Sequence, residues 1–291
     1  MKFVIGCIVS ILFLSSCEKD INFDLDEVEP VLSVDAQIEN DRPPVVVLTR
    51  SFSYFDKLSP ELLSNAFVRD AEVYVRNGTR TQRLKEYSYP LAPGISGYYY
   101  TADSTNLANA FTGALGGSYE LKILNAGQEY SARTTIPAAS QFPDSVWFIR
   151  APQNPDTTLR AMYIRASDPP GRGNYYRYFT QASRGEFLPG ENVFDDQVID
   201  GTTYNIMLPR GVNRNRPMSM DDNFYLKGEI VTLKYCSIDA ASYKFWNTWE
   251  FAFQSIGNPF AQPNKVLGNI SNGALGIFCG YAAEYRTYIL P

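Results

Sequence analysis

Histidine is missing from the sequence altogether. A histidine base drives Ser-His-Asp and Cys-His catalysis, and histidine is also a frequent zinc ligand and the usual pH switch near neutrality. Its absence excludes these sites. Acid–base catalysis would therefore have to use carboxylates.

Basic residues are also too few to suggest a nucleic-acid partner. Lys and Arg number 26 against 31 Asp and Glu, so the net charge is −5, and the basic residues form no long run. Binding to DNA or RNA depends on a basic surface that replaces counterions. We therefore expect no nucleic acid as a partner.

The apolar run near the N-terminus is short. It covers residues 3–14 and has 12 residues, whereas a membrane-spanning helix needs about 20. Preceded by Lys2, it fits the hydrophobic region of a secretory signal. We predict a lipoprotein signal peptide over residues 1–16.

The end of this run indicates lipidation. Leu14-Ser15-Ser16-Cys17 has the order of a bacterial lipobox, an aliphatic residue and two small residues before a cysteine. We predict lipid on Cys17, which would anchor the chain to the outer membrane because acyl chains contribute about 0.8 kcal/mol per buried CH₂. The alternative is a plain secretory signal cut near Ser15 or Ser16.

An acidic stretch follows, so that residues 17–30 comprise the lipidated cysteine and a tether. EKDINFDLDEVEP (18–30) carries six acids and one lysine. Fully extended, it would reach roughly 40 Å. This stretch resembles the acidic tether of lipoproteins that are exported to the cell surface, and on that resemblance we expect the body to face the cell exterior. An ordinary solvated linker is the alternative.

The cysteines are few. The sequence has four, Cys7, Cys17, Cys236 and Cys279. Cys7 would leave with the signal peptide and Cys17 would take lipid. In an oxidising compartment a disulfide between Cys236 and Cys279 is one expectation. Two buried free thiols that act as small hydrophobic residues are the other.

The remaining chain is typical of a mainly β protein, with 45% hydrophobic residues, 20 Gly and 18 Pro. Residues 31–140 are predicted to form an immunoglobulin-like or transthyretin-like β-sandwich domain. Asn77-Gly78 marks a hairpin turn, and a short helix is expected over 59–66 with Ser59 as its N-cap. The expected strands lie at 31–38, 43–52, 70–87 (two), 97–103 and 116–137 (two).

Residues 141–291 are predicted to form a second β-rich domain with one aromatic helix at 239–255. Strands are expected at 144–150, 159–168, 174–183, 223–238 and 276–290. In the helix, Tyr243, Trp246, Trp249 and Phe253 recur at helical spacing and should share a buried face, which leaves Lys244 and Asn247 nearer solvent.

No group of residues stands out as catalytic. The pairs Asp195-Asp196 and Asp221-Asp222 could help to bind calcium, but exposed loop acids explain them more simply. Glu186, Glu191 and Glu229 have no spacing that selects a glycosidase pair. We therefore expect no enzyme, no catalytic residues, no metal and no cofactor.

Some aromatic and glycine-rich runs could instead bind a ligand. Tyrosines in the strand runs could stack on sugars, although strands favour tyrosine anyway. Trp246 and Trp249 are better explained as core residues. The glycine-rich run 268–278 is interpreted as a structural turn that docks the closing strand under the helix. The tyrosines are Tyr98, Tyr99, Tyr100, Tyr175, Tyr176 and Tyr178.

Three stretches resemble a known family: SVDAQIENDRPPVVVLTRSFSYFD (33–56), DAEVYVRNG (70–78) and, most specifically, the aromatic helix with the glycine-rich entry into the last strand (237–282). With the lipobox, the chain resembles the Bacteroidota lipoprotein family called domain of unknown function 4249. Its members look like outer-membrane lipoproteins, often encoded beside TonB-dependent receptors. The resemblance implies a binding or accessory lipoprotein for nutrient uptake and supplies no catalytic residues. A surface hydrolase using carboxylates and a structural or adhesive surface protein are the alternatives.

Overall fold

The computed structural model describes residues 29–52, 59–190, 193–213, 219–256, 258 and 264–291. The predicted signal peptide and Cys17 lie outside these residues. The chain divides into two compact units, Met1–Pro30 and Val31–Pro291. No helix in the described ranges is long and apolar enough to span a bilayer.

The fold is mainly β, as predicted, and the strands of the first half match the expected runs. Alternation of apolar and polar residues produces them, because every second side chain of β1 and β2 is buried. The strands are β1 (Leu32–Glu39), β2 (Val45–Arg50), β3 (Glu72–Asn77), β4 (Arg80–Ala92), β5 (Ile95–Ala102), β6 (Ser118–Asn125) and β7 (Gln128–Thr135).

Local signals set the turns as expected. Gly78, in the turn between β3 and β4, has φ of 56°, which glycine adopts without a Cβ clash. Helix α2 (Pro60–Ala66) begins after Ser59, whose hydroxyl accepts from Leu62 N at 3.1 Å. The N-cap prediction for Ser59 is confirmed.

Strand β4 connects two layers of the first half. Its first residues, Arg80–Arg83, pair with β3, and from Leu84 on it pairs with β5. A hydrophobic core lies between the two layers and includes Val34, Leu48, Val75 and Leu121. This arrangement agrees with the sandwich expected for residues 31–140.

The second half adds two layers and a helix. Strands β10 (Tyr175–Ala182), β15 (Ile230–Ile238) and β16 (Leu275–Ile289) extend the large sheet, with short pieces β11 (Leu188–Pro189) and β12 (Phe194–Asp195) beside β10. A second sheet packs on them, and its residues Met162 and Leu208 share a hydrophobic core with Tyr235 of β15. It contains β8 (Ser145–Arg150), β9 (Leu159–Ser167), β13 (Thr203–Leu208) and β14 (Tyr225–Leu226).

Four elements were not expected from the sequence. Strands β11, β12 and β13 lie between the predicted strands 174–183 and 223–238, and a 3-10 helix η2 (Met220–Asn223) lies at the end of the same stretch. β13 alternates weakly, with one buried residue among six. It is held by its pairing with β9, which periodicity within the strand does not reveal.

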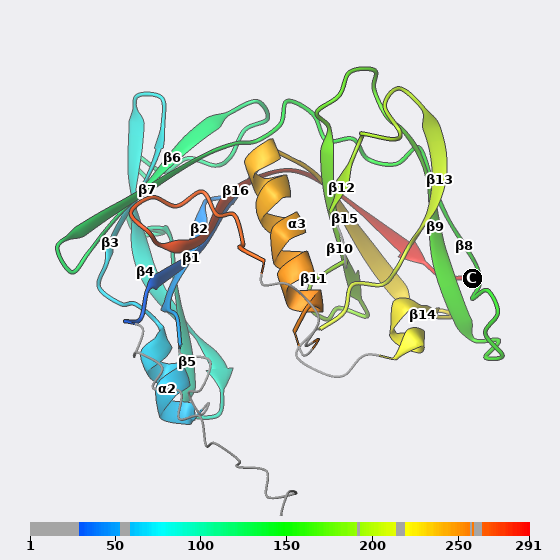
Figure 1. Cartoon of the computed structure of the whole chain (residues 1–291), viewed down its shortest axis with the longest axis horizontal. Helices are drawn as coiled ribbons and strands as arrows, with labels where there is room; N and C mark the ends of the chain where they lie inside the picture. The colour runs from blue at the N-terminus through cyan, green and yellow to red at the C-terminus, as the bar shows by residue number, and fades with distance from the viewer. Residues whose placement is uncertain (1–28, 53–58, 191–192, 214–218, 257, 259–263) are drawn as a thin grey trace, which may run out of the picture. The chain divides into compact units, whose positions relative to one another are not determined.

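Helix α3 (Ala240–Gln254) confirms the predicted aromatic helix (Figure 1). The Asp239 carboxylate accepts from Ser242 N at 2.8 Å and caps it. Lys244 and Asn247 are exposed, as expected. The four predicted face residues are only half-buried, and the most buried residues are Ser242, Phe245 and Glu250.

Strand β16 runs through both halves of the chain (Figure 1). Its residues Leu275–Tyr281 pair in parallel with β1, while Tyr281–Ile289 pair antiparallel with β15, so one mixed sheet of 12 strands results. The pairing of β16 with β1 crosses the predicted boundary between domains 31–140 and 141–291. The division into these two domains stays a prediction.

Candidate functional site

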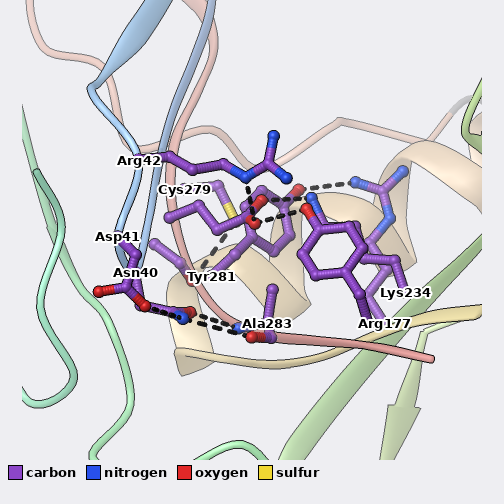
Figure 2. A network of polar contacts seen from close by, with 11 residues as sticks. Asn40, Asp41, Arg42, Arg177, Lys234, Cys279, Tyr281 and Ala283 are labelled. Carbon is purple, nitrogen blue, oxygen red and sulfur yellow. Dashed lines mark hydrogen bonds and ion pairs between the residues drawn. The ribbon is translucent and has the colours of Figure 1, made fainter.

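A buried polar network lies where β16 changes partner (Figure 2). Glu39, at the end of β1, accepts a hydrogen bond from Lys234 Nζ of β15 at 2.5 Å, and their side chains are 8% and 10% exposed. Tyr285 OH donates to the other carboxylate oxygen at 2.5 Å, and Arg42 Nε lies 3.1 Å from it. A buried charge is tolerated only when its hydrogen-bonding capacity is used in this way.

Asn40 completes the change of partner. The pairing of β1 with β16 ends at Glu39 and Tyr281. Beyond this point the backbone of Ala283 has no β1 residue to pair with. The Asn40 side chain replaces the missing strand: its Oδ1 accepts from Ala283 N at 2.7 Å and its Nδ2 donates to Ala283 O at 3.3 Å. Both polar groups of the buried backbone are thus satisfied.

Arg177 attaches helix α3 to the sheet. It lies on β10, is 5% exposed, and donates from Nη1 to Tyr281 OH at 3.0 Å. Its guanidinium carbon lies 3.3 Å from the ring centroid of Trp246 on α3, a cation–π contact. This contact supports the interpretation of Trp246 as a structural residue rather than a ligand platform.

Cys236 and Cys279 are buried free thiols in the structure, which agrees with the second of the two expectations and not with a disulfide. Cys236 on β15 pairs with Ala283, four residues along β16 from Cys279. Four strand residues span about 13 Å, whereas the Cα atoms of a disulfide lie about 4.4–6.8 Å apart. Burial raises the pKa of Cys236 to about 12 and that of Cys279 to about 11.

Both thiols should therefore resist alkylation in the native protein. The thiolate is the reactive form, and the raised pKa keeps both groups protonated at pH 8. We expect iodoacetamide to leave Cys236 and Cys279 unmodified in the folded protein and to modify both in denaturant without reductant, as read by peptide mass spectrometry. Modification in denaturant only after reduction would show a disulfide instead.

One acidic cluster gathers residues from two loops. Asp168, Asp196 and Asp200 each offer an oxygen, and these oxygens lie within 4.8 Å of one another. Such a set could begin a calcium site, which needs six to eight oxygens. Donors from the protein already approach each carboxylate: Tyr176 OH (2.7 Å to Asp168), Gly173 N (2.7 Å to Asp196) and Gly171 N (2.7 Å to Asp200). We assign the cluster to holding these loops together.

The other acids singled out in the sequence are dispersed. Asp195 accepts from Tyr243 OH at 2.7 Å, and burial followed by this carboxylate raises the pKa of Tyr243 to about 12. Asp221 accepts from Asn154, and Asp222 caps η2. Glu229 accepts from Arg210, Glu186 is exposed, and Glu191 lies outside the described residues.

Most of the candidate tyrosines have structural contacts. Tyr100 is 2% exposed and donates to Glu86, Tyr175 stacks on Tyr243 at 4.8 Å, and Tyr178 donates to Pro209 O. Tyr176 donates to Asp168 of the acidic cluster. The guanidinium carbon of Arg69 lies 4.2 Å from the ring centroid of Tyr98. Tyr99 is half-exposed and lies beside Tyr87 and Tyr89.

The glycine-rich run 268–278 is anchored to strand β7, and the strand that it enters, β16, packs against α3 through Ile277 and Cys279 beside Phe245. Asn269 donates to Arg133 O at 3.1 Å, and Ser271 N donates to Ser131 O at 2.8 Å. In the described sheet β7 is a terminal strand, and these contacts cover its open edge. Gly276 (φ 102°) is required, because a Cβ there would lie 1.9 Å from Val34 O.

A shallow pocket of about 1040 Å³ lies beside this run. Ion pairs cross it on neighbouring strands, with Glu120 contacting both Arg76 (3.8 Å) and Arg133 (2.5 Å). These side chains are largely exposed, so each pair contributes little to stability. They form no set of residues suited to catalysis.

Comparison with known proteins gives one informative match. A model of the family described as "Domain of unknown function (DUF4249)" matches residues 18–287. No curated protein matches the chain significantly. Among solved structures, a chain of "Cytokine receptor complex - Crystal form 1A" is 10% identical, with 87% of this chain and 95% of that chain covered. Its TM-score of 0.25 is too low to support any argument.

Proposed function

The chain belongs to the domain of unknown function 4249 family, and on that premise we propose that it is a lipid-anchored outer-membrane lipoprotein. In this proposal the body faces the cell exterior and binds a nutrient or assists a TonB-dependent receptor in its uptake. The protein acts as a binding or accessory module and not as an enzyme.

The observation that carries the anchor is the sequence Leu14-Ser15-Ser16-Cys17 at the end of a 12-residue apolar run. A cysteine in this setting is the acceptor of a diacylglycerol and an amide-linked acyl chain. Two or three acyl chains bind a membrane stably, whereas one binds only reversibly. The acidic residues that follow would keep the tether solvated.

Two features support a binding role over catalysis. Histidine is absent, and the acids that could replace it either accept hydrogen bonds from neighbouring donors or are far from one another. The polar network around Glu39 joins β1, β15 and β16, which is a structural task.

The lipid anchor is tested by Cys17→Ser. We expect this variant to lose labelling by a fatty-acid analogue and to leave the membrane fraction or accumulate as unprocessed precursor. Cys7→Ser is the matched control, because it removes a cysteine from the same segment but not from the lipobox, and it should label like the wild type. Wild-type labelling of Cys17→Ser would refute the anchor.

The receptor partnership is tested separately by capture through a C-terminal tag from solubilised outer membranes. We expect a TonB-dependent receptor to co-purify with the wild-type protein. Its absence from cross-linked captures would contradict the accessory role while leaving the lipid anchor intact.

A further inference from the structure

The hairpin of β4 and β5 presents a row of tyrosines on one face. Tyr87 and Tyr89 alternate along β4, and Tyr99 is directly opposite Tyr87 on β5. The ring centroids of Tyr87 and Tyr99 are 5.8 Å apart with an angle of 27° between the planes, and Tyr89 meets Tyr99 at 5.9 Å. The three rings form one continuous aromatic surface.

Gly97 sets the position of the outermost ring. It is opposite Tyr89 in the register, and a Cβ at this glycine would lie 2.4 Å from Cζ of Tyr89. The ring therefore occupies the space of the missing side chain and covers the strand, a known way of shielding a glycine in a sheet. Gly97 is buried, while Tyr89 keeps 38% of its surface exposed.

Polar side chains continue the row at its other end. Lys85 precedes Tyr87 on the same face, and its Nζ lies 3.2 Å from Asp103 Oδ1. An ammonium group and a carboxylate therefore lie together at this end of the row.

We propose that the tyrosine row of Tyr87, Tyr89 and Tyr99, with the Lys85–Asp103 ion pair at its end, binds a neutral pyranose glycan. The C–H face of a pyranose ring is flat and apolar and packs on an exposed aromatic ring. Its hydroxyl groups both donate and accept hydrogen bonds, which suits the ammonium group of Lys85 and the carboxylate of Asp103.

This inference names the ligand class of the proposed nutrient-uptake function and rests on that function for its biological role. Glycan binding is measured on the purified full-length protein, without a receptor. Loss of glycan binding and loss of receptor capture are therefore separate results, and either proposal can fail alone.

The test is affinity electrophoresis in gels that contain starch, mixed-linkage β-glucan, xylan or galactomannan. We expect at least one glycan to retard the wild-type protein. Tyr89→Ala and Asp103→Ala should each weaken that binding at least tenfold, whereas Tyr89→Phe, which keeps the ring, should bind like the wild type. Tyr74→Ala is the matched control, because Tyr74 is a partly exposed strand tyrosine away from the row.

Circular dichroism and thermal melts of each variant show whether it is folded, and Asp103→Ala keeps the test decisive if Tyr89→Ala does not fold. Two results would overturn the proposal. One is migration of the wild type unaffected by all four glycans. The other is a folded Tyr89→Ala or Asp103→Ala variant that is retarded as strongly as the wild type.

Discussion

Replacing Glu39 with alanine is expected to lower the free energy of unfolding by about 3–5 kcal/mol. The change removes the carboxylate that lies 2.5 Å from Lys234 Nζ and leaves this ammonium group buried without an anion. It also removes the acceptor of Tyr285 OH. The loss of stability comes mainly from the uncompensated charge of Lys234. The attraction within the intact pair is itself offset by the cost of desolvating both groups.

Chemical denaturation of the wild type and variants measures this effect, and two controls isolate its cause. Glu120→Ala removes a carboxylate with two arginine neighbours on the surface and should cost at most about 1 kcal/mol. The double variant Glu39→Leu with Lys234→Met removes both charges and should recover most of the lost stability. Equal losses for Glu39→Ala and Glu120→Ala would contradict the role assigned to burial.

Trp246→Ala is expected to destabilise the protein by about 3 kcal/mol. The ring packs edge-on against Phe245 at 4.9 Å and Trp249 at 6.0 Å, and it covers the buried guanidinium of Arg177. Its removal leaves a cavity and deprives Arg177 of its cation–π contact. Lys244→Ala, two residues earlier on the exposed side of α3, should change stability by no more than about 0.5 kcal/mol.

Thermal melts of the two variants separate structure from binding. A melt of Trp246→Ala that overlays the wild type, together with lost receptor capture, would refute the packing role and make α3 a binding surface. Because Trp246 is half-buried, we expect a smaller loss of stability than for a fully buried tryptophan. The comparison with Lys244→Ala therefore decides whether Trp246 is a packing residue.

Local sequence signals predicted those elements whose cause lies within a few residues. Ser59 and Pro60 begin α2 because the hydroxyl and the proline ring act within one turn. Asn77-Gly78 produces its hairpin because glycine accepts positive φ. In α3 the aromatic spacing identified the helix, but the buried positions Phe245 and Glu250 were missed, because the direction from which β10 and β16 approach is not encoded in that spacing.

The candidate sites could be predicted only in part. Tyr99 was recognised as a strand tyrosine able to stack on a ligand. Tyr87 and Tyr89 join it only through the register of β4 and β5, and Gly97 explains the position of Tyr89. Nothing near Glu39 in the sequence indicates Lys234, 195 residues away. Ion pairs of this kind arise only when distant strands meet.

Local patterns of side chains were enough to predict the β-rich class, the aromatic helix with its cap, and the family. The two sheet partners of β16, the free state of Cys236 and Cys279, and the joining of tyrosines from two strands into one surface became known from the fold. These features depend on strand register, and register is set by packing across the whole chain.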